Sequence, residues 1–403
     1  MNDLRIALYH NLHSGGAKRV VEEQARRLSA AHTVHVYSTS AADLAFARDT
    51  ANAASVSILQ YRTLPFAPSP FGRFNPALWL INLARLDALA RQTAKMIDDA
   101  NFDVALVHPC QMTQAPLVLR YLKTPSLYYC HELPRKLYEP DPARPQSRRR
   151  QFRRTLDRID PLLKSWEWRI KYLDRASAQR ATRIASNSKF TSGNIQAAYA
   201  RSSQVCYPGV DAGAFQPSPR ARESFVLSVG ALTPSKGFDW IIRALGELPS
   251  ATRPSLVLIC NYQEMDERNY LNDLAERLQV QVDFRVGVTE AELQDAYARA
   301  RCVVYAPIRE PLGLVALEAM AAGAPLIGVA EGGVAETIID NVTGLLVPRD
   351  PSAIAQAIDQ LGTRQEFARQ LGEQAREHVR EHWTWEQHIT SVENILTETE
   401  ESK

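Results

Sequence analysis

Two carboxylates frame the start of a short apolar stretch in the second half of the chain. Glu310 precedes Pro311-Leu312-Gly313, and Glu318 follows among Leu, Ala and Met side chains. A helix that begins near Gly313 leaves its first backbone N–H groups unpaired, and such groups favour anions. Because helical side chains lean toward the N-terminus, Glu318 can point at the same ligand. The pattern favours phosphate beside hydroxyls, as in a nucleotide diphosphate with its ribose. The alternative is a solvated acid on a surface helix.

Two strand-to-helix turns offer glycines and a cation. Gly15 and Gly16 follow the first expected strand, where they let a phosphate approach the backbone closely, although a plain turn explains them equally well. In the second half, Gly230 opens a similar turn that ends in Lys236-Gly237. A Lys at a helix start opposes the helix dipole, but it is well placed if its ammonium meets an anionic diphosphate. A solvated Lys is the alternative.

Two further strand ends carry candidate residues. His131 follows the expected strand 126–130, and cleft residues of parallel sheets sit at such carboxyl ends. A lone His is more often a structural residue bound to a backbone carbonyl. The segment 283–288 predicts a strand and a tight turn, in which Gly287 and Val288 would let a nucleotide base stack against the backbone.

Residues 135–183 form a basic segment. Its main cations are Arg148, Arg149, Arg150, Arg153, Arg154, Arg158, Lys164, Arg169, Lys171, Arg175, Arg180 and Arg183. Apolar residues recur in it at helical spacing: Leu156, Ile159, Leu162, Leu163, Trp166, Ile170 and Leu173. Such a helix can lie on an anionic membrane, or it can pack its apolar face on its own domain while the arginines stay solvated. We expect no nucleic-acid partner, because no reader module accompanies the charge.

Composition predicts a globular protein with two domains. The 403 residues exceed one ordinary domain, and 45% hydrophobic and 23% charged residues are typical of globular chains. The net charge of +2 selects no partner. The N-terminus lacks a long apolar region and a small-residue cleavage site, so we expect a cytoplasmic protein without a secretory signal. The apolar stretch 314–330 contains Glu318, Gly323 and Pro325, which argues against a membrane span.

Five dispersed cysteines, odd in number, favour reduced core residues over metal ligands or disulfides. They are Cys110, Cys130, Cys206, Cys260 and Cys302.

Strands and helices are expected to alternate almost throughout, which predicts parallel sheets covered on both faces. The expected strands are 4–9, 33–38, 104–108, 126–130, 183–186, 203–207, 225–229, 255–260, 282–285, 301–306, 325–329 and 344–347. The expected helices include 17–30, 80–99, 236–247, 264–279, 290–299, 313–322, 333–340 and 351–361. The Pro- and Gly-rich segment from Tyr207 to Arg220 marks the best domain boundary.

Taken in order, these motifs resemble the family-four retaining glycosyltransferases of the GT-B fold. The resemblance covers nearly the whole chain, and Glu310 with Glu318 is its most specific part. It implies two Rossmann-like doubly wound α/β domains facing across a cleft: an acceptor-binding domain at 1–207 and a nucleotide-sugar domain at 208–380. The ending Trp383-Thr384-Trp385-Glu386 is similar to the family's last helix, which implies that 381–403 packs back on the first domain.

The resemblance also implies roles for the candidate residues. Glu318 would bind the ribose hydroxyls and Glu310 would lie by the donor sugar. Lys236 would hold the diphosphate together with the backbone of Gly313 and Leu314. From the other domain, Gly16 would approach the phosphates and His131 would contact the sugar near the reacting carbon. The family transfers sugar with retention of anomeric configuration and requires no metal.

One position departs from the family pattern. Many relatives carry Arg where this chain has Ala231, and that Arg helps hold the diphosphate. Its loss would weaken leaving-group stabilisation, because a charge-assisted hydrogen bond contributes roughly 1.5–3 kcal/mol. Arg309 or Lys18 is a candidate to compensate. No second carboxylate is placed as a nucleophile, unlike in retaining glycosidases, which favours same-face attack over a covalent intermediate.

The donor and the acceptor stay open at this stage. The segment 129–135 is similar to stretches in mannosyltransferases that build lipid-linked glycans, which favours GDP-mannose over a UDP-hexose. The acceptor is expected to be a glycan, a polyprenyl-linked glycan or a small molecule. Two alternatives are a GT-B sugar-nucleotide epimerase, which would convert donor without acceptor, and a non-catalytic sugar-nucleotide-binding homologue, for which Ala231 argues.

Overall fold

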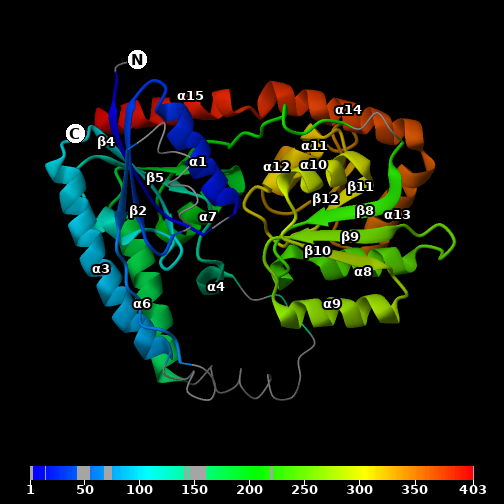
Figure 1. Cartoon of the computed structure of the whole chain (residues 1–403), viewed down its shortest axis with the longest axis horizontal. Helices are drawn as coiled ribbons and strands as arrows, with labels where there is room; N and C mark the ends of the chain where they lie inside the picture. Colours follow the sequence, from blue (N-terminus) through cyan, green and yellow to red (C-terminus); the bar gives the residue numbers. More distant parts are fainter. Residues whose placement is uncertain are drawn as a thin grey trace. The chain divides into compact units, whose positions relative to one another are not determined.

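The chain divides into two compact units. The computed structural model describes residues 3–13, 15–42, 55–67, 75–139, 142, 144, 160–217 and 221–402. Unit 1 comprises Met1–Cys206 and Ile389–Lys403, and unit 2 comprises Tyr207–His388. Each unit has its own parallel sheet with helices on both faces, and Figure 1 follows the elements by colour along the chain.

The sheet of unit 1 has the strand order β3-β2-β1-β4-β5-β6-β7 within the described part of the chain. The strands are β1 (Arg5–Asn11), β2 (Thr33–Thr39), β3 (Ser55–Leu59), β4 (Val104–Cys110), β5 (Ser126–Cys130), β6 (Arg183–Ser186) and β7 (Gln204–Val205). All of β4 is buried, and so is β1 after Arg5. Such near-continuous apolar runs arise because helices cover both faces of a parallel sheet.

The α-helices of unit 1 include one from the far end of the sequence. They are α1 (Gly16–Leu28), α3 (Asn75–Asp99), α4 (Arg135–Tyr138), α6 (Pro161–Ala178), α7 (Lys189–Tyr199) and, from Ile389 onward, α15 (Trp385–Glu400). His32 Nε2 lies 3.3 Å from Glu393 Oε1, and Gln204 Nε2 donates to Glu398 Oε2 at 3.0 Å. The last helix is therefore bound to unit 1 at two places.

Unit 2 has the strand order β10-β9-β8-β11-β12-β13. Its strands are β8 (Glu223–Val229), β9 (Ser255–Cys260), β10 (Val282–Val286), β11 (Ala300–Tyr305), β12 (Leu326–Val329) and β13 (Leu345–Val347). Its helices are the short 3-10 helix η3 (Pro234–Lys236), then α8 (Phe238–Glu247), α9 (Met265–Arg277), α10 (Glu290–Arg299), α11 (Leu314–Ala321), α12 (Val334–Thr337), α13 (Pro351–Thr363) and α14 (Gln365–His382). One apolar core lies on each face of this sheet.

Both sheets reverse their strand order beside their first strand, between β1 and β4 in unit 1 and between β8 and β11 in unit 2. Ligands of doubly wound sheets bind at this reversal, outside the carboxyl ends of the strands. The doubly wound α/β class predicted from the sequence is confirmed in both units. The strand β3 was not predicted, because it is short, contains two serines among its five residues and gives a weak apolar signal. All five cysteines are buried, and none forms a disulfide.

Candidate functional site

Three loops at the carboxyl edge of the unit 2 sheet are bonded to one another. They follow β8, β11 and β12, the strands at and next to the reversal point. Ile308 N donates to Ser235 O at 2.8 Å, which joins the first loop to the second. Gly333 N donates to Glu310 O at 2.8 Å, which joins the second loop to the third. The edge is therefore one connected layer of backbone.

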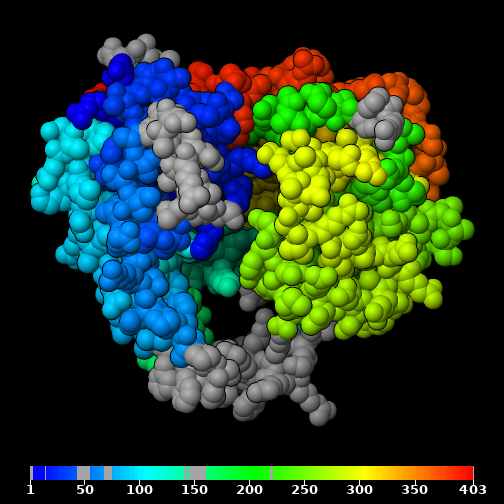
Figure 2. Space-filling view, in the orientation of Figure 1, coloured from blue at the N-terminus to red at the C-terminus, as the bar shows by residue number. Residues whose placement is uncertain are grey.

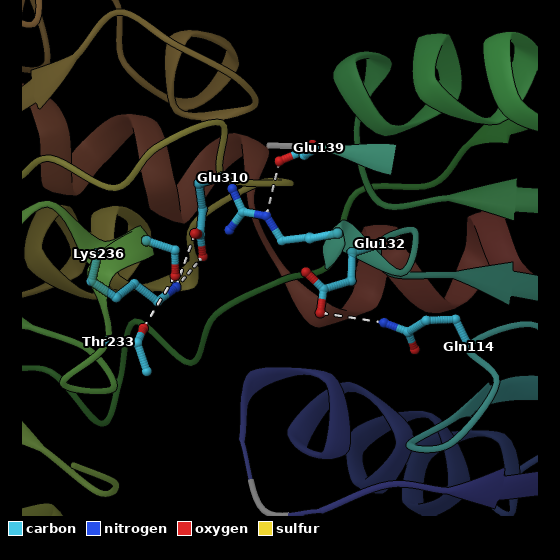
Figure 3. A network of polar contacts seen from close by, with 8 residues as sticks. Gln114, Glu132, Glu139, Thr233, Lys236 and Glu310 are labelled. Atoms are coloured by element: carbon cyan, nitrogen blue, oxygen red, sulfur yellow. Dashed lines mark hydrogen bonds and ion pairs between the residues drawn. The ribbon is translucent and has the colours of Figure 1, made fainter. Parts of the chain in front are cut away.

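Lys236 and Glu310 form an ion pair in this layer. Lys236 Nζ lies 2.8 Å from Glu310 Oε1 and 2.9 Å from Oε2, and both side chains are largely buried. Figure 3 shows the two side chains pointing toward each other, with Thr233 alongside. The sequence assigned these residues to different parts of one ligand, and the structure shows that they lie in direct contact. The Lys236 ammonium is therefore oriented by a carboxylate.

Glycines allow the loops to approach so closely. Gly313 caps α11 with φ 96°, and a Cβ there would stand 2.6 Å from Tyr305 Cε1. Gly332 has φ 60°, and a Cβ there would stand 2.4 Å from Glu310 O. A side chain at either position would force Glu310 or the start of α11 to move. Gly230 is covered by the Lys236 side chain, whose Cγ and Cδ lie 3.4 Å from where its Cβ would be.

Glu318 is buried on α11, with 5% of its surface exposed. Tyr297 of α10 donates a hydrogen bond from its hydroxyl to Glu318 Oε2 at 2.9 Å. The alternative of a solvated surface acid is therefore wrong. The tyrosine was not anticipated, because its contact with Glu318 spans two helices and a strand. Leu314 is the first residue of the helix, so its N–H belongs to the group that α11 leaves without a helical acceptor.

Arg349 fastens the loop that carries Glu310. Its guanidinium donates to the backbone oxygens of Ala306 at 2.8 Å and Pro307 at 2.7 Å. It also donates to both oxygens of Glu331, at 2.9 and 2.8 Å. The guanidinium, with a smaller effect from Arg309, lowers the pKa of the Glu331 carboxyl from its usual value. This clamp was not found from the sequence, where Arg349 is an isolated cation after β13.

The candidates to replace the missing cation at Ala231 lie in different surroundings. Ala231 is partly exposed in the loop after β8. Arg309 is exposed, has φ 48°, and directs its charge and its backbone N–H toward Glu331. Lys18, in unit 1, is buried and lies 3.3 Å from Glu22. Arg309 thus lies in the same unit 2 loop as Glu310, whereas Lys18 lies on α1 of unit 1.

Gly287 and Val288 lie at the end of the edge strand β10. Gly287 is exposed with φ 68°, and its N–H donates to Cys260 O at 2.9 Å. Val288 is half-buried against the core on the α10 and α11 face. The structure therefore places this pair at the same edge of the sheet as Lys236, two strands away from β8.

His131 in unit 1 is buried in a chain of polar side chains. Its Nε2 lies 3.1 Å from His108 Nδ1, and His108 Nε2 lies 2.7 Å from Gln24 Oε1. Because the Gln24 oxygen only accepts, His108 donates from Nε2, and a neutral His108 then accepts from His131 Nε2. One partner of His131 is thus a second imidazole ring. Next to it, Gln114 Nε2 donates to Glu132 Oε1 at 3.5 Å (Figure 3).

Gly15 and Gly16 lie at the reversal point of unit 1. Gly15 is the N-cap of α1, with φ 150°, and both glycines are exposed. The residue before them, Ser14, lies outside the described residues. The described backbone therefore presents the start of a thirteen-residue helix to the surface, without a side-chain cap.

The basic segment is described only from residue 160 onward, apart from 135–139, 142 and 144, so the arginines from Arg148 to Arg158 lie outside the described residues. In α6, Ile170 and Leu173 are buried in the unit 1 core and Trp166 packs against it. The opposite face carries Trp168 and Tyr172, which are 65% and 50% exposed. Their rings stack with centroids 5.8 Å apart. Ile170, Leu173 and Trp166 of the expected apolar stripe thus face inward, Leu162 is 42% exposed, and the Trp168–Tyr172 pair faces out.

Two family models match the chain. Residues 14–213 match Glycosyltransferase Family 4, and residues 213–378 match Glycosyl transferases group 1. The chain therefore belongs to the family-four glycosyltransferases of the GT-B fold.

Several curated relatives match parts of the chain. An uncharacterised glycosyltransferase of Methanocaldococcus jannaschii is 34% identical over 43% of this chain and 44% of that protein. The D-inositol 3-phosphate glycosyltransferase of Mycobacteroides abscessus is 35% identical over 36% and 35%. A GDP-mannose-dependent alpha-(1-6)-phosphatidylinositol monomannoside mannosyltransferase of Mycobacterium tuberculosis is 32% identical over 52% and 60%. The chain thus spans between 35% and 60% of the length of these three relatives.

Solved structures match over nearly the whole chain. Anabaena HepE in complex with UDP-glucose superposes with a TM-score of 0.73 at 19% identity, covering 98% of this chain and 100% of that one. Sucrose-phosphate synthase from Thermosynechococcus elongatus superposes with a TM-score of 0.74 at 20% identity, covering 99% of both chains. These similarities show the fold.

No described helix combines the length and the apolarity that crossing a bilayer requires.

Proposed function

We propose that this protein is a retaining glycosyltransferase that moves a hexose from a nucleotide-diphosphate sugar to an acceptor. The observation that carries the proposal is the Lys236–Glu310 pair, which lies at the reversal point of the unit 2 sheet beside the start of α11. A cation and unpaired backbone N–H groups at this edge suit a diphosphate leaving group. Family membership and the curated relatives support the same reaction class.

In this proposal the site residues bind different parts of the donor. Lys236 and the N–H groups of Gly313 and Leu314 would bind the diphosphate, and Glu318 would accept hydrogen bonds from the ribose hydroxyls. Glu310, next to Lys236, would lie by the sugar. The barrier to sugar transfer is departure of the diphosphate as positive charge grows on the anomeric carbon, so preorganised donors at the phosphates lower it.

The remaining predicted residues act on the same donor in this proposal. Gly230 would bring backbone to the phosphates, and Gly287 with Val288 would hold the base. From unit 1, Gly15 and Gly16 would approach the phosphates, and His131 would contact the sugar near the reacting carbon. The acceptor hydroxyl would attack on the face that the leaving group occupies and give its proton to a donor phosphate oxygen, without a metal ion.

GDP-mannose is the favoured donor, and a UDP-hexose is the next candidate. The mannosyltransferase relative is described as GDP-mannose-dependent, whereas the HepE structure contains UDP-glucose. The favoured acceptor is a glycan, either polyprenyl-linked or free, and a small molecule is the third candidate. We place the protein in the cytoplasm, with peripheral contact to an anionic membrane.

One titration and one assay test this function. Purified protein is titrated with GDP, UDP and ADP in a calorimeter, and each nucleotide sugar is then incubated with and without candidate acceptors. Saturable nucleotide binding, with transfer that needs an acceptor, is expected. Conversion of donor without acceptor would indicate the epimerase alternative, and binding without any turnover would indicate the non-catalytic homologue. NMR of the product anomer tests retention, and an unchanged rate in EDTA tests metal independence.

The exposed aromatic pair on α6 supports the membrane contact. Trp168 and Tyr172 are flanked on the solvent side by Lys164, Arg169 and Arg175, all exposed. Aromatic rings between cations suit the interface of an anionic bilayer. Flotation with anionic vesicles should recover the protein, and the Trp168→Ala/Tyr172→Ala variant should float several-fold less. The Ile339→Ala variant, which removes an exposed apolar side chain of unit 2, should float like the wild type. Equal flotation of the aromatic variant would remove this contact from the proposal.

A further inference from the structure

Exposed apolar side chains gather at the ends of β9 and β10 in unit 2. Tyr262, just after β9, is 57% exposed; Met265, the first residue of α9, is 58% exposed; and Val286, the last residue of β10, is 44% exposed. Large apolar side chains left in water at the carboxyl edge of a doubly wound sheet lie where ligands bind. The segments that contain α9 and β10 form part of the surface of unit 2 drawn in yellow-green in Figure 2.

Met265 and Val286 lie toward the same edge of the unit 2 sheet. The guanidinium of Arg268, on α9, lies 5.2 Å from the ring centroid of Phe284 on β10, so the helix packs over this strand. The crossover helix α9 starts at Met265 after the carboxyl end of β9, and β10 has its carboxyl end at Val286. One turn of helix before Arg268 and two residues of strand after Phe284 therefore both lead toward that edge.

Tyr262 is joined by backbone hydrogen bonds to the loop that carries Lys236. Leu232 N donates to Tyr262 O at 2.7 Å, and Glu264 N donates to Leu232 O at 3.0 Å. Leu232 directly follows Ala231. The aromatic residue and the proposed phosphate loop are thus parts of one backbone framework, so a ligand bound to one is held at a fixed distance from the other.

The spacing fits a nucleotide. β10 lies two strands from β8, which is about 10 Å at the usual separation of strands. Gly287 adjoins the patch with an exposed backbone, and the space where its Cβ would stand is open. A flat ring can therefore lie against Gly287 while a diphosphate attached to it reaches back toward Lys236.

We propose that Tyr262, with Met265 and Val286, forms an apolar platform on which the base of the donor nucleotide stacks. This inference rests on the proposed function and names side chains for a base contact that the sequence assigned to backbone alone. A stacking platform accepts any base, because every base has a π-face. The platform therefore supplies affinity for the nucleoside part of the donor and leaves the choice between GDP and UDP to polar groups.

Calorimetry of Tyr262 variants tests the platform. Tyr262→Ala should weaken GDP and UDP binding by at least about fivefold, the lower end of what a base–aromatic stack contributes. Tyr262→Phe should retain wild-type affinity, because the ring remains. Binding of inorganic pyrophosphate, which has no base, should be equal in the wild type and in Tyr262→Ala. Ile339→Ala serves as the matched control for removal of an exposed apolar side chain from the same unit.

Each outcome bears on one proposal or the other. If the wild type binds neither nucleoside diphosphates nor pyrophosphate, the proposed function fails and the platform fails with it. If the wild type binds GDP or UDP and Tyr262→Ala binds it equally well, the platform alone is wrong. An equal loss of pyrophosphate affinity in Tyr262→Ala would show that the effect comes through the phosphate loop, which also overturns the platform.

Discussion

The reversal point of the unit 2 sheet carries an ion pair, whereas the carboxyl edge of the unit 1 sheet carries a chain of polar side chains that contact one another. In unit 2, Lys236 and Glu310 face each other with ionic groups at hydrogen-bond distance. In unit 1, His131, His108 and Gln24 form a buried chain of contacting polar side chains. The two sheets share one strand order up to the sixth strand. The difference shows that the same topology positions an ion pair in one unit and two contacting histidine rings in the other.

Removal of the Lys236 charge tests the charged half of this comparison and should have the largest effect. Lys236→Met should lower turnover by about 10²- to 10³-fold, the range measured for loss of one preorganised donor to a developing negative charge. Nucleoside diphosphate affinity should fall as well. Steady-state kinetics and calorimetry give both quantities.

A double variant that neutralises both Lys236 and Glu310 separates the loss of turnover from the loss of stability in that experiment. Lys236→Met alone leaves Glu310 largely buried without its partner, so the melting temperature should fall. Lys236→Met/Glu310→Gln should regain much of the stability but none of the turnover. The Arg277→Ala variant, at an exposed position on α9, should match the wild type. Full turnover in the double variant would contradict a role for the Lys236 charge.

The unit 1 half of the comparison is tested at His131 and His108. His131→Ala should lower turnover by about 10²-fold, if the ring contacts the donor sugar as proposed. His108→Gln should lower it by less than tenfold, because His108 acts only through its contact with His131. Both variants should lose similar stability, measured by urea unfolding. Equal losses of turnover would show that His131 has a structural role only.

The Arg349 clamp tests how far the charged site depends on its scaffold. Arg349→Met removes the bonds to Ala306 O and Pro307 O and leaves Glu331 without its main partner. Turnover should fall by about tenfold, and the free energy of unfolding by about 1–3 kcal/mol. Restoration of both by Glu331→Gln in the same chain would assign the loss to the unpaired carboxylate. Arg243→Met, at an exposed position on α8, is the matched control.

Asp174 should give unit 1 a pH-dependent stability with the smallest effect on activity. Burial raises the pKa of this α6 carboxyl to about 7, although Ala115 N and the hydroxyls of Tyr199 and Tyr138 donate to it. The folded form thus holds a proton that the unfolded form releases near pH 4. The stabilisation this provides is complete below about pH 4 and is lost as the pH rises to about 7.

Urea unfolding at pH 5 and pH 8 measures this effect. The wild type should lose free energy of unfolding, on the order of a few kcal/mol, between the two values. Asp174→Asn should lose clearly less, because the amide does not titrate in this range. An unchanged pH dependence in the variant would contradict the assignment. Turnover at pH 7 should change by less than a factor of two.

Much of the sheet architecture was predictable, because it follows from local sequence. Buried strands such as β4 and β9 are short apolar runs bounded by turn residues, and they appear within two residues of the expected positions. The loops with Lys236 and Glu310 were predicted from the sequence because each combines glycines with a charged residue directly after an expected strand. The strand β3 was missed because only its last residue is buried, so it contains no continuous apolar run.

The partners of the site residues were not predictable, because they come from distant positions in the sequence. Tyr297 reaches Glu318, Arg349 reaches Glu331, and His108 reaches His131 only after folding. The two tryptophans of α6 show that burial can also differ between residues close together in the sequence. Trp166 and Trp168 lie two positions apart, so one packs inward and the other faces solvent.

The place of α15 has a consequence for synthesis on the ribosome. Unit 1 contains the first residues to be translated, yet it also contains Ile389–Lys403. Chains fold from the N-terminus as they emerge. The unit that emerges first is therefore completed last, after all of unit 2 has been translated. Until then His32 and Gln204 lack their partners Glu393 and Glu398 on α15. The surface of unit 1 that α15 later covers is therefore available to a chaperone throughout elongation.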